Sequence, residues 1–181
     1  MTEFFFIRHG ETDWNKKGLM QGHTDIPLND TGLAQAEKAA QTLKNHDIKH
    51  LICSPLQRCL QTAEAAKKIF NLSLTLDDRL IERSFGDFEG MDRMSIPRDE
   101  HGHIQGEVES VEPFAGVIKR AKDTIEHYTN LHKGERILFI SHGGVGAALH
   151  VALCDQKIML ANAVPYHFTC ENGLWQSRQI D

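Results

Sequence analysis

The sequence predicts an α/β fold, a three-layer sandwich whose central sheet is mostly parallel and carries a C-terminal antiparallel hairpin at one edge. Short apolar runs alternate along the chain with segments of helical periodicity, as in repeated β–α units. Near the C-terminus, Asn172-Gly173 separates two strand-like stretches, and Asn-Gly favours the tight turn of a hairpin. The 181 residues, 40% of them apolar, suffice for one core, so we expect a single domain over residues 1–181.

The strands are predicted from short runs rich in aliphatic, aromatic or β-branched residues. These runs are Phe4–Ile7, Lys49–Cys53, Leu72–Leu76, Arg136–Ile140, Tyr166–Cys170 and Leu174–Ser177. Helical periodicity predicts helices over residues 31–45 after the N-cap group Asn29-Asp30-Thr31, from Ser54-Pro55 to about Phe70, from Pro113 to about Leu131, and after Gly144 to about Leu153. Residues 12–30 are predicted to be a loop. Residues 83–112 are predicted to be a lid or excursion with one short helix near Met91–Ile96.

Composition argues against several classes of function. The formal net charge of −5 disfavours a general nucleic-acid binder and an anionic membrane surface as partner. No apolar run approaches the length of a membrane span, and the Phe-rich N-terminus lacks the basic leader and cleavage site of a signal peptide. We therefore expect a cytoplasmic protein whose four cysteines, which form no C-x-x-C pair, are reduced thiols.

Two of the predicted strands end in the same way. Phe4–Ile7 leads into Arg8-His9-Gly10, and Arg136–Ile140 leads into Ser141-His142-Gly143. Because open α/β sheets bind ligands at the carboxyl ends of their strands, the two imidazoles should face one another across one pocket. Arg58 falls in the first turn of a predicted helix, where the helix dipole disfavours a cation unless an anion is bound beside it. The pocket is therefore expected to bind an anion.

These side chains suit the transfer of a phosphoryl group. Arg8 and Arg58 can grip the phosphate oxygens, one neutral imidazole can attack phosphorus, and the other, when protonated, can stabilise the transition state. A carboxylic acid near position 82 can protonate the leaving alkoxide and later activate water. Arginines then supply the charge that Mg²⁺ supplies elsewhere, so no metal is required. The residues alone leave the nucleophile open between His9 and His142, and the acid open among Glu82, Asp77, Asp78 and Glu89.

Other chemistries fit less well. A zinc hydrolase built on the two histidines would need a third ligand, and the adjacent arginines would repel the ion. The spacing from Cys53 to Arg58 is one residue too short for the Cys-x5-Arg loop of cysteine phosphatases. The polar group Asp99, Glu100, His101 and His103 stands among Gly and Pro and is interpreted as a solvated loop. A protein that only binds phosphorylated partners would not need a positioned acid.

Several motifs follow one another in a fixed order. They are Ile7-Arg8-His9-Gly10-Glu11-Thr12 with Asn15, Gln21-Gly22, Leu28 through Thr31-Gly32 with Gln35-Ala36, Ser54-Pro55-Leu56-Gln57-Arg58 with Gln61-Thr62-Ala63, Leu80-Ile81-Glu82, Phe85-Gly86, Glu89-Gly90 and Ser141-His142-Gly143. This order resembles that of the histidine phosphatase superfamily, with its RHG motif, which includes cofactor-dependent phosphoglycerate mutase and its phosphatase relatives. Phe88 departs from the Trp of many relatives.

The resemblance implies a phosphoglycerate mutase-like fold and a role for each site residue. It implies that His9 is the phosphorylated nucleophile, that Glu82 is the proton donor, and that the following residues bind phosphate or substrate: Arg8, Asn15, Gln21, Gly22, Arg58, His142 and Gly143. Mutases of the family carry a longer insertion between the positions of Glu82 and His142. We therefore expect a phosphatase that acts on a small phosphorylated metabolite, without a metal or other cofactor.

The alternatives are a mutase, which needs 2,3-bisphosphoglycerate, and a phosphoprotein or phosphohistidine phosphatase or binding regulator. Substrate specificity is expected from residues 12–30 and from the excursion, where Arg83, Arg93 and Arg98 are candidate second anion contacts. The edge hairpin could pair with a second copy of the chain, so a homodimer is a further expectation.

Overall fold

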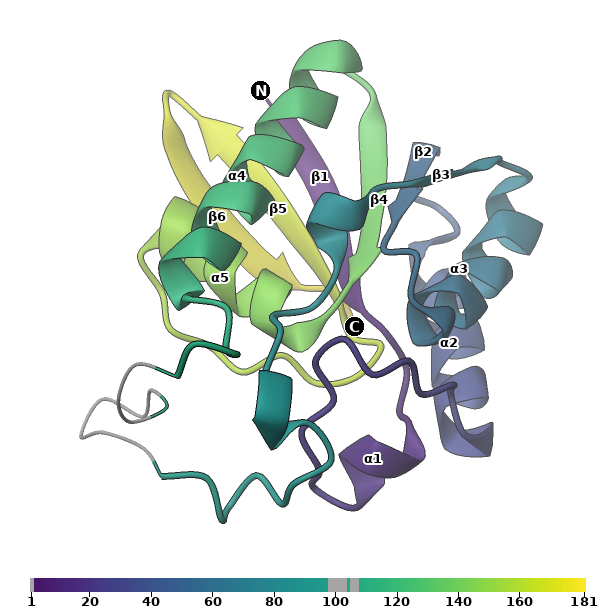
Figure 1. Cartoon of the computed structure of the whole chain (residues 1–181). Helices are drawn as coiled ribbons and strands as arrows, with labels where there is room; N and C mark the ends of the chain where they lie inside the picture. Colours follow the sequence, from purple (N-terminus) through teal and green to yellow (C-terminus); the bar gives the residue numbers. More distant parts are fainter. Residues whose placement is uncertain (1, 98–103, 105–107) are drawn as a thin grey trace.

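The computed structural model describes residues 2–97, 104 and 108–181, which form a six-stranded sheet in the order β3-β2-β4-β1-β5-β6 (Figure 1). The strands are β1 (Thr2–Arg8), β2 (Ile48–Cys53), β3 (Leu74–Leu76), β4 (Arg136–Ser141), β5 (Pro165–Glu171) and β6 (Leu174–Gln179). The pairs β3–β2, β2–β4 and β4–β1 are all parallel, and β5 pairs antiparallel with β1. The predicted mostly parallel sheet is confirmed.

The C-terminal hairpin lies at the edge of the sheet, as the Asn-Gly signal predicts. β5 and β6 pair antiparallel from Tyr166↔Gln179 to Glu171↔Leu174. The two turn residues, Asn172 and Gly173, have φ of 52° and 81°. Positive φ at both central positions matches the twist of the flanking strands, and Asn and Gly are the residues that adopt it most readily.

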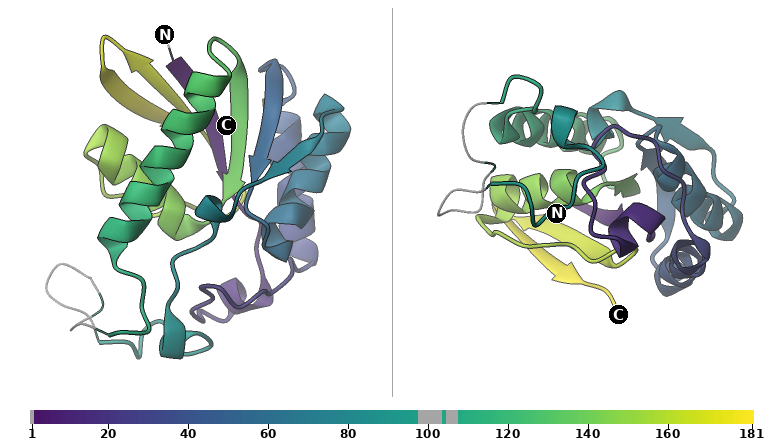
Figure 2. Two further views of the ribbon diagram at one scale, coloured as in Figure 1. Left: turned by 45° about the horizontal axis from the view of Figure 1, so that its top comes forward. Right: turned by 60° about the horizontal axis from the view of Figure 1, so that its bottom comes forward.

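Helices cover both faces of the sheet (Figure 2). The helices are α1 (Asp13–Lys16), α2 (Asp30–Leu43), α3 (Gln57–Phe70), α4 (Phe114–Leu131) and α5 (Gly143–Cys154), with short 3₁₀ turns η1 (Asp78–Leu80) and η2 (Gly86–Phe88). Side chains alternate along β1: Phe4 and Phe6 pack in the core under α4 and α5, whereas Phe5 and Ile7 pack under α2 and α3. The predicted three-layer sandwich is confirmed, and the unbroken apolar run of β1 follows from its burial on both faces.

The predicted helix near Met91–Ile96 is wrong. This stretch makes turns in which the Ser95 amide and hydroxyl both donate to the Asp92 carbonyl, while Asp92 forms an isolated antiparallel bridge with Leu19. Backbone N–H and C=O groups of this stretch therefore bond to the loop that contains Leu19 rather than to one another in a helix.

The start of α3 also differs from the prediction. Its N-cap is Leu56 rather than Ser54, and Leu56 makes no side-chain cap. The Ser54 hydroxyl instead contacts the ring of His142 at 2.7 Å. Within the loop predicted for residues 12–30, the turn of α1 is closed by a reciprocal capping box between Thr12 and Asn15.

Two predicted features cannot be placed. Arg98 and the polar group Asp99, Glu100, His101 and His103 lie outside the described residues. Over the described part of the chain, no helix is both long and apolar enough to cross a membrane.

Candidate active site

The pairing of β1 with β4 sets the two histidines side by side. Arg8 lies opposite Ser141 in the register, and the His9 amide donates to the Ser141 carbonyl at 2.9 Å. The residue after each of these two is a histidine. The ring centroids of His9 and His142 are 5.2 Å apart, and the ring planes meet at 63°. Both side chains are buried. The structure therefore brings together the imidazoles that the matched strand endings predict.

The hydrogen bond of His9 determines its tautomer. Its Nδ1 lies 2.7 Å from the Gly10 carbonyl oxygen. A carbonyl oxygen can only accept, so Nδ1 carries the proton and Nε2 carries the lone pair. Burial lowers the pKa of His9 well below its usual range, and the neighbouring Arg8 and Arg58 lower it further. His9 is neutral at pH 7, the state in which Nε2 can act as a nucleophile.

His142 has the opposite tautomer. Arg58 Nε donates to its Nδ1 at 3.2 Å, so the ring proton is on Nε2, which donates to the Ser54 hydroxyl. Burial, followed by the charge of Arg58, lowers the pKa of His142 well below its usual range. His142 is therefore neutral in this arrangement, and the positive charge of the pocket resides on the arginines rather than on the protonated imidazole that the sequence suggests.

Arg58 is fully buried, although its position in the first turn of α3 looks exposed in the sequence. Besides His142, it donates to the carbonyls of Thr24 at 2.9 Å and Gly22 at 2.7 Å. Gly22 has φ of 54°, and a Cβ there would lie 2.0 Å from Glu89 Oε1. Only glycine fits this turn without strain, and the turn aims its carbonyl at Arg58.

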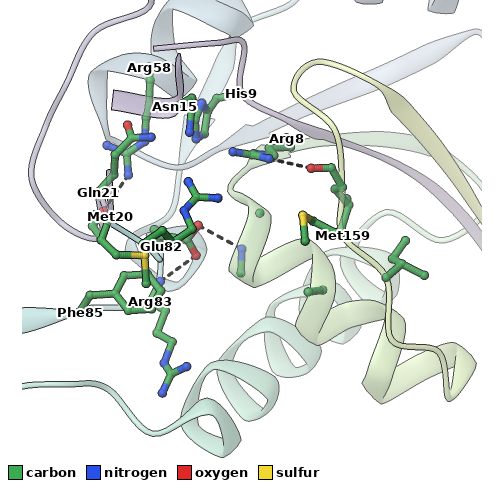
Figure 3. A pocket seen from close by; sticks show the side chains of 17 residues that line it. Arg8, His9, Asn15, Met20, Gln21, Arg58, Glu82, Arg83, Phe85 and Met159 are labelled. Carbon is green, nitrogen blue, oxygen red and sulfur yellow. Dashed lines mark hydrogen bonds between the residues drawn. The ribbon is translucent and has the colours of Figure 1, made fainter. Parts of the chain in front are cut away.

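Arg8 lies on the other side of His9 (Figure 3). Its Nη1 donates to the Leu160 carbonyl at 2.7 Å, while its buried Nε has no hydrogen-bond partner among the described residues. Burial lowers the pKa of Arg8 to about 10, with Arg93 and Arg58 adding to the effect and Glu82 opposing it. In the part of the chain that the structure describes, no carboxylate lies within ion-pair distance of Arg8 or Arg58. The two guanidiniums are thus available to a bound anion.

Glu82 is the acid that reaches this pocket. Its Oε2 accepts from the Gly144 amide at 3.0 Å and its Oε1 from the Arg83 amide at 2.9 Å. A Cβ on residue 144 would lie 2.3 Å from Glu82 Oε1, so the start of α5 must be glycine for the carboxylate to dock there.

The other three acids that the sequence leaves open do not line the pocket. Asp77 accepts from the Arg79 guanidinium. Glu89 accepts from the Thr24 hydroxyl and from the amides of His23, Thr24 and Phe85. Burial acts to raise the pKa of Glu89, but these hydrogen bonds hold it below the usual range. Asp78 lies in η1.

The remaining predicted residues, Asn15, Gln21, Gly22 and Gly143, also line the pocket, which has a volume of about 240 Å³. Gly143 lies beneath Arg8, where a Cβ would stand 3.3 Å from Nε. Arg83 and Arg93 line the pocket too. The described residues that line it therefore include four arginines and, as the single carboxylate, Glu82. This balance suits a multiply charged anion.

Comparison with known proteins decides the family. A profile of the histidine phosphatase superfamily (branch 1) matches residues 4–177. The chain belongs to this superfamily. It is 32% identical over 155 residues to an uncharacterized phosphatase, PhoE, of Bacillus subtilis, covering 86% of this chain and 77% of that protein. It is 33% identical over 151 residues to a probable phosphoglycerate mutase, GpmB, of Photorhabdus laumondii, covering 79% of this chain and 70% of the relative.

Solved structures agree with the family assignment. The phosphoserine phosphatase of Entamoeba histolytica, in complex with 3-phosphoglyceric acid, superposes with a TM-score of 0.87 at 25% identity, covering 100% of this chain and 98% of that one. The protein YhfR of Bacillus stearothermophilus gives 0.84 at 26% identity, covering 97% and 95%. With phosphatases among its relatives, this histidine phosphatase is a phosphoric monoester hydrolase.

Sequence reasoning missed one wall of this histidine phosphatase pocket, formed by the segment that precedes β5. Asn162 Nδ2 donates to the His9 carbonyl at 2.9 Å and approaches Asn15 Oδ1 at 3.2 Å, so it holds the loop after β1. Ile158 and Met159 add apolar surface, although Met159 is 88% exposed (Figure 3). The segment has no periodicity or motif, so nothing in the sequence could have identified it.

The buried neutral histidines predict a pH-dependent stability. The folded pKa of His9 is depressed, so below the ordinary value of about 6.5 the unfolded chain binds a proton that the folded chain does not. The free energy of unfolding should then fall as pH falls below about 6.5, by up to about 1.4 kcal/mol per pH unit for this residue, and its contribution should be complete above that pH. Urea denaturation at several pH values measures the slope.

His9→Asn is the matched variant, because its amide can still donate to the Gly10 carbonyl but cannot titrate. Its stability should fall less steeply than that of the wild type between pH 6.5 and 5. Parallel profiles for the two proteins would contradict the assignment of a buried neutral His9.

Proposed function

We propose that this chain is a metal-independent phosphomonoesterase that hydrolyses a small phosphorylated metabolite through a phosphohistidine on His9. The proposal rests on the tautomer of His9 and on the two guanidiniums beside it. His9, whose tautomer leaves the lone pair on Nε2, lies between two guanidiniums that have no carboxylate partner among the described residues. A phosphate dianion is the partner that two such guanidiniums can bind in a bidentate manner.

In the first step, His9 Nε2 attacks phosphorus and the bond from phosphorus to the ester oxygen breaks. Glu82, in its acid form, gives its proton to the departing oxygen, so the alcohol leaves neutral. Arg8 and Arg58 stabilise the negative charge on the three other phosphate oxygens, the task that Mg²⁺ performs in other phosphoryl transfers. His142 holds Arg58 in place through the bond to Nδ1.

In the second step, the Glu82 carboxylate takes a proton from water, whose oxygen attacks phosphorus as the bond to Nε2 breaks. Inorganic phosphate leaves, His9 returns to its neutral tautomer, and Glu82 is again an acid. The same carboxyl group thus serves both steps. Its two hydrogen bonds from backbone amides fix its position in the pocket.

Hydrolysis, rather than transfer to a second phosphorylated acceptor, is favoured by the short segment between Glu82 and His142. Relatives bear both names, phosphatase and phosphoglycerate mutase, so similarity alone does not choose between them. We propose that water is the acceptor and that 2,3-bisphosphoglycerate is not required. A reaction that starts only after 2,3-bisphosphoglycerate is added would favour the mutase.

The pocket supports a substrate with a second anionic group. Arg93 lines the pocket, and its buried Nε has no hydrogen-bond partner in the part of the chain that the structure describes. With Arg8 and Arg58 assigned to the phosphate, Arg93 remains for a carboxylate or a second phosphate. The structural relatives from Entamoeba histolytica were solved with phosphoserine and 3-phosphoglyceric acid, each a phosphomonoester that also carries a carboxylate.

Glu82→Gln tests the acid–base role. With p-nitrophenyl phosphate, whose leaving group needs no proton, the variant should release a burst of nitrophenolate equal to the enzyme and then turn over roughly 10²–10⁴-fold more slowly than wild type. With an alkyl phosphate, whose leaving alkoxide needs a proton, the variant should release no burst of alcohol. Both enzymes are assayed in excess EDTA by stopped flow. Equal activity of variant and wild type, or loss of wild-type activity in EDTA, would contradict the mechanism.

Arg93→Met tests the second anion contact. For phosphoserine or 3-phosphoglycerate, kcat/KM should fall roughly 10- to 100-fold, the value of a charged hydrogen bond, whereas p-nitrophenyl phosphate should be affected little. Arg178→Met, which removes an exposed arginine of β6, is the control and should leave both substrates unchanged. An equal loss for both substrates would assign Arg93 to the transferred phosphate instead.

A further inference from the structure

Three potential metal ligands lie together at the end of the strands opposite to the pocket. His50 comes from β2, His132 is the C-cap of α4, and Glu135 immediately precedes β4. Their ligand atoms all lie within 4.8 Å of one another. The pocket is at the carboxyl ends of β1, β2 and β4, whereas these residues lie towards the amino ends of β2 and β4, where His50 pairs with Ile137. The cluster is therefore separate from the catalytic groups.

We propose that His50, His132 and Glu135 form a binding site for a divalent transition-metal ion, with Zn²⁺ as the representative ion. Two imidazole nitrogens and one carboxylate oxygen are ligands that Zn²⁺ and its neighbours in the first transition row accept, whereas Mg²⁺ and Ca²⁺ prefer oxygen. Glu135 is half exposed, at 52%, so water can complete the coordination from the solvent side.

Of the two separations from a histidine nitrogen to Glu135, one is shorter and one longer than the separation of two ligands on a tetrahedral ion. His50 Nε2 lies 2.7 Å and His132 Nδ1 lies 3.8 Å from the same oxygen, Oε2 of Glu135. Ligands of a tetrahedral ion with bonds of about 2.0–2.1 Å stand roughly 3.3 Å apart. On binding, the 2.7 Å separation must lengthen and the 3.8 Å separation must shorten, each by roughly half an ångström, which is a small shift for partly exposed side chains.

The two rings are stacked, with centroids 3.6 Å apart at 21°. Because an ion held by both nitrogens needs the ring planes to converge, binding must rotate the rings out of this stack. The side chains of His50 and His132 are 26% and 23% exposed, so the protein encloses each of them only in part. Lys49, whose charge also acts on Glu135, is paired with Asp47 at 2.6 Å.

A bound ion would join β2 to the turn between α4 and β4. The Glu135 amide already donates to the His132 carbonyl in this turn, at 3.1 Å, so two of the ligands are preset by the local backbone. The third ligand, His50, is separated from them by most of two β–α units in the sequence. Zn²⁺ at this site would therefore stabilise the fold without taking part in phosphoryl transfer.

Isothermal titration of the chelator-treated full chain with ZnCl₂ tests the proposal. Wild type should bind one Zn²⁺ that His132→Ala and Glu135→Gln bind at least roughly tenfold more weakly. His127→Ala is the matched control, because it removes an exposed histidine of the same helix outside the cluster, and it should bind like wild type. At a zinc concentration about 100 times the Kd, the Tm of wild type should rise by roughly 5–10 °C.

Wild-type affinity in both ligand variants, an equal loss in His127→Ala, or no zinc binding by the wild type would overturn the proposal. Phosphatase activity in EDTA provides an independent readout. His132→Ala should keep the wild-type rate there, so loss of the zinc site and failure of the phosphohistidine mechanism give different results.

Discussion

The parallel pairing of β1 with β4 is the interaction on which the active site depends. It aligns Arg8 with Ser141, and one residue later it places His9 against His142. Because both strands are buried on both faces, this register cannot slip without moving large aromatic side chains such as Phe6 and Phe139 out of the core. The geometry of the two imidazoles is thus determined by core packing rather than by contacts between them.

Positive charge is buried around these imidazoles at a cost in solvation. Arg58 is fully buried and the pKa of Arg8 is lowered to about 10, which shows how poorly the site solvates cations. Backbone carbonyls of Gly22, Thr24 and Leu160 offset part of this cost, but they are dipoles and not charges. A phosphate dianion, the ligand proposed here, would supply this counter-charge, so the desolvated guanidiniums favour its binding.

Much of this arrangement could be predicted from the sequence. Strand runs bounded by turn residues predicted the sheet, and the matched endings Arg8-His9-Gly10 and His142-Gly143 predicted the pocket, because parallel strands bring their carboxyl ends to one edge. The helix predicted near Met91–Ile96 failed because backbone pairing with Leu19 overrides local composition. The cap predicted at Ser54 failed because its hydroxyl is used by His142.

Other features depend on contacts that no local pattern encodes. Asn162 reaches His9 across 153 positions of sequence. Arg58 looks like a surface residue on its helix, but it is buried, and its guanidinium donates to the carbonyls of Gly22 and Thr24 in a loop distant in the sequence. The choice of Glu82 over Glu89 could not be derived from spacing, since both follow a short strand. Only the folded structure shows that Glu82 lines the pocket and that Glu89 does not.

The most direct test of the account is to locate the phosphate on the enzyme. The Glu82→Gln variant is mixed with p-nitrophenyl phosphate and quenched in base, which preserves phosphohistidine, and the modified residue is identified by peptide mass spectrometry and ³¹P NMR. We predict one phosphate on His9, attached to Nε2, because the Nδ1 proton is held by the Gly10 carbonyl. Phosphate on His142, phosphate on Nδ1 of His9, or no phosphoenzyme at all would contradict it.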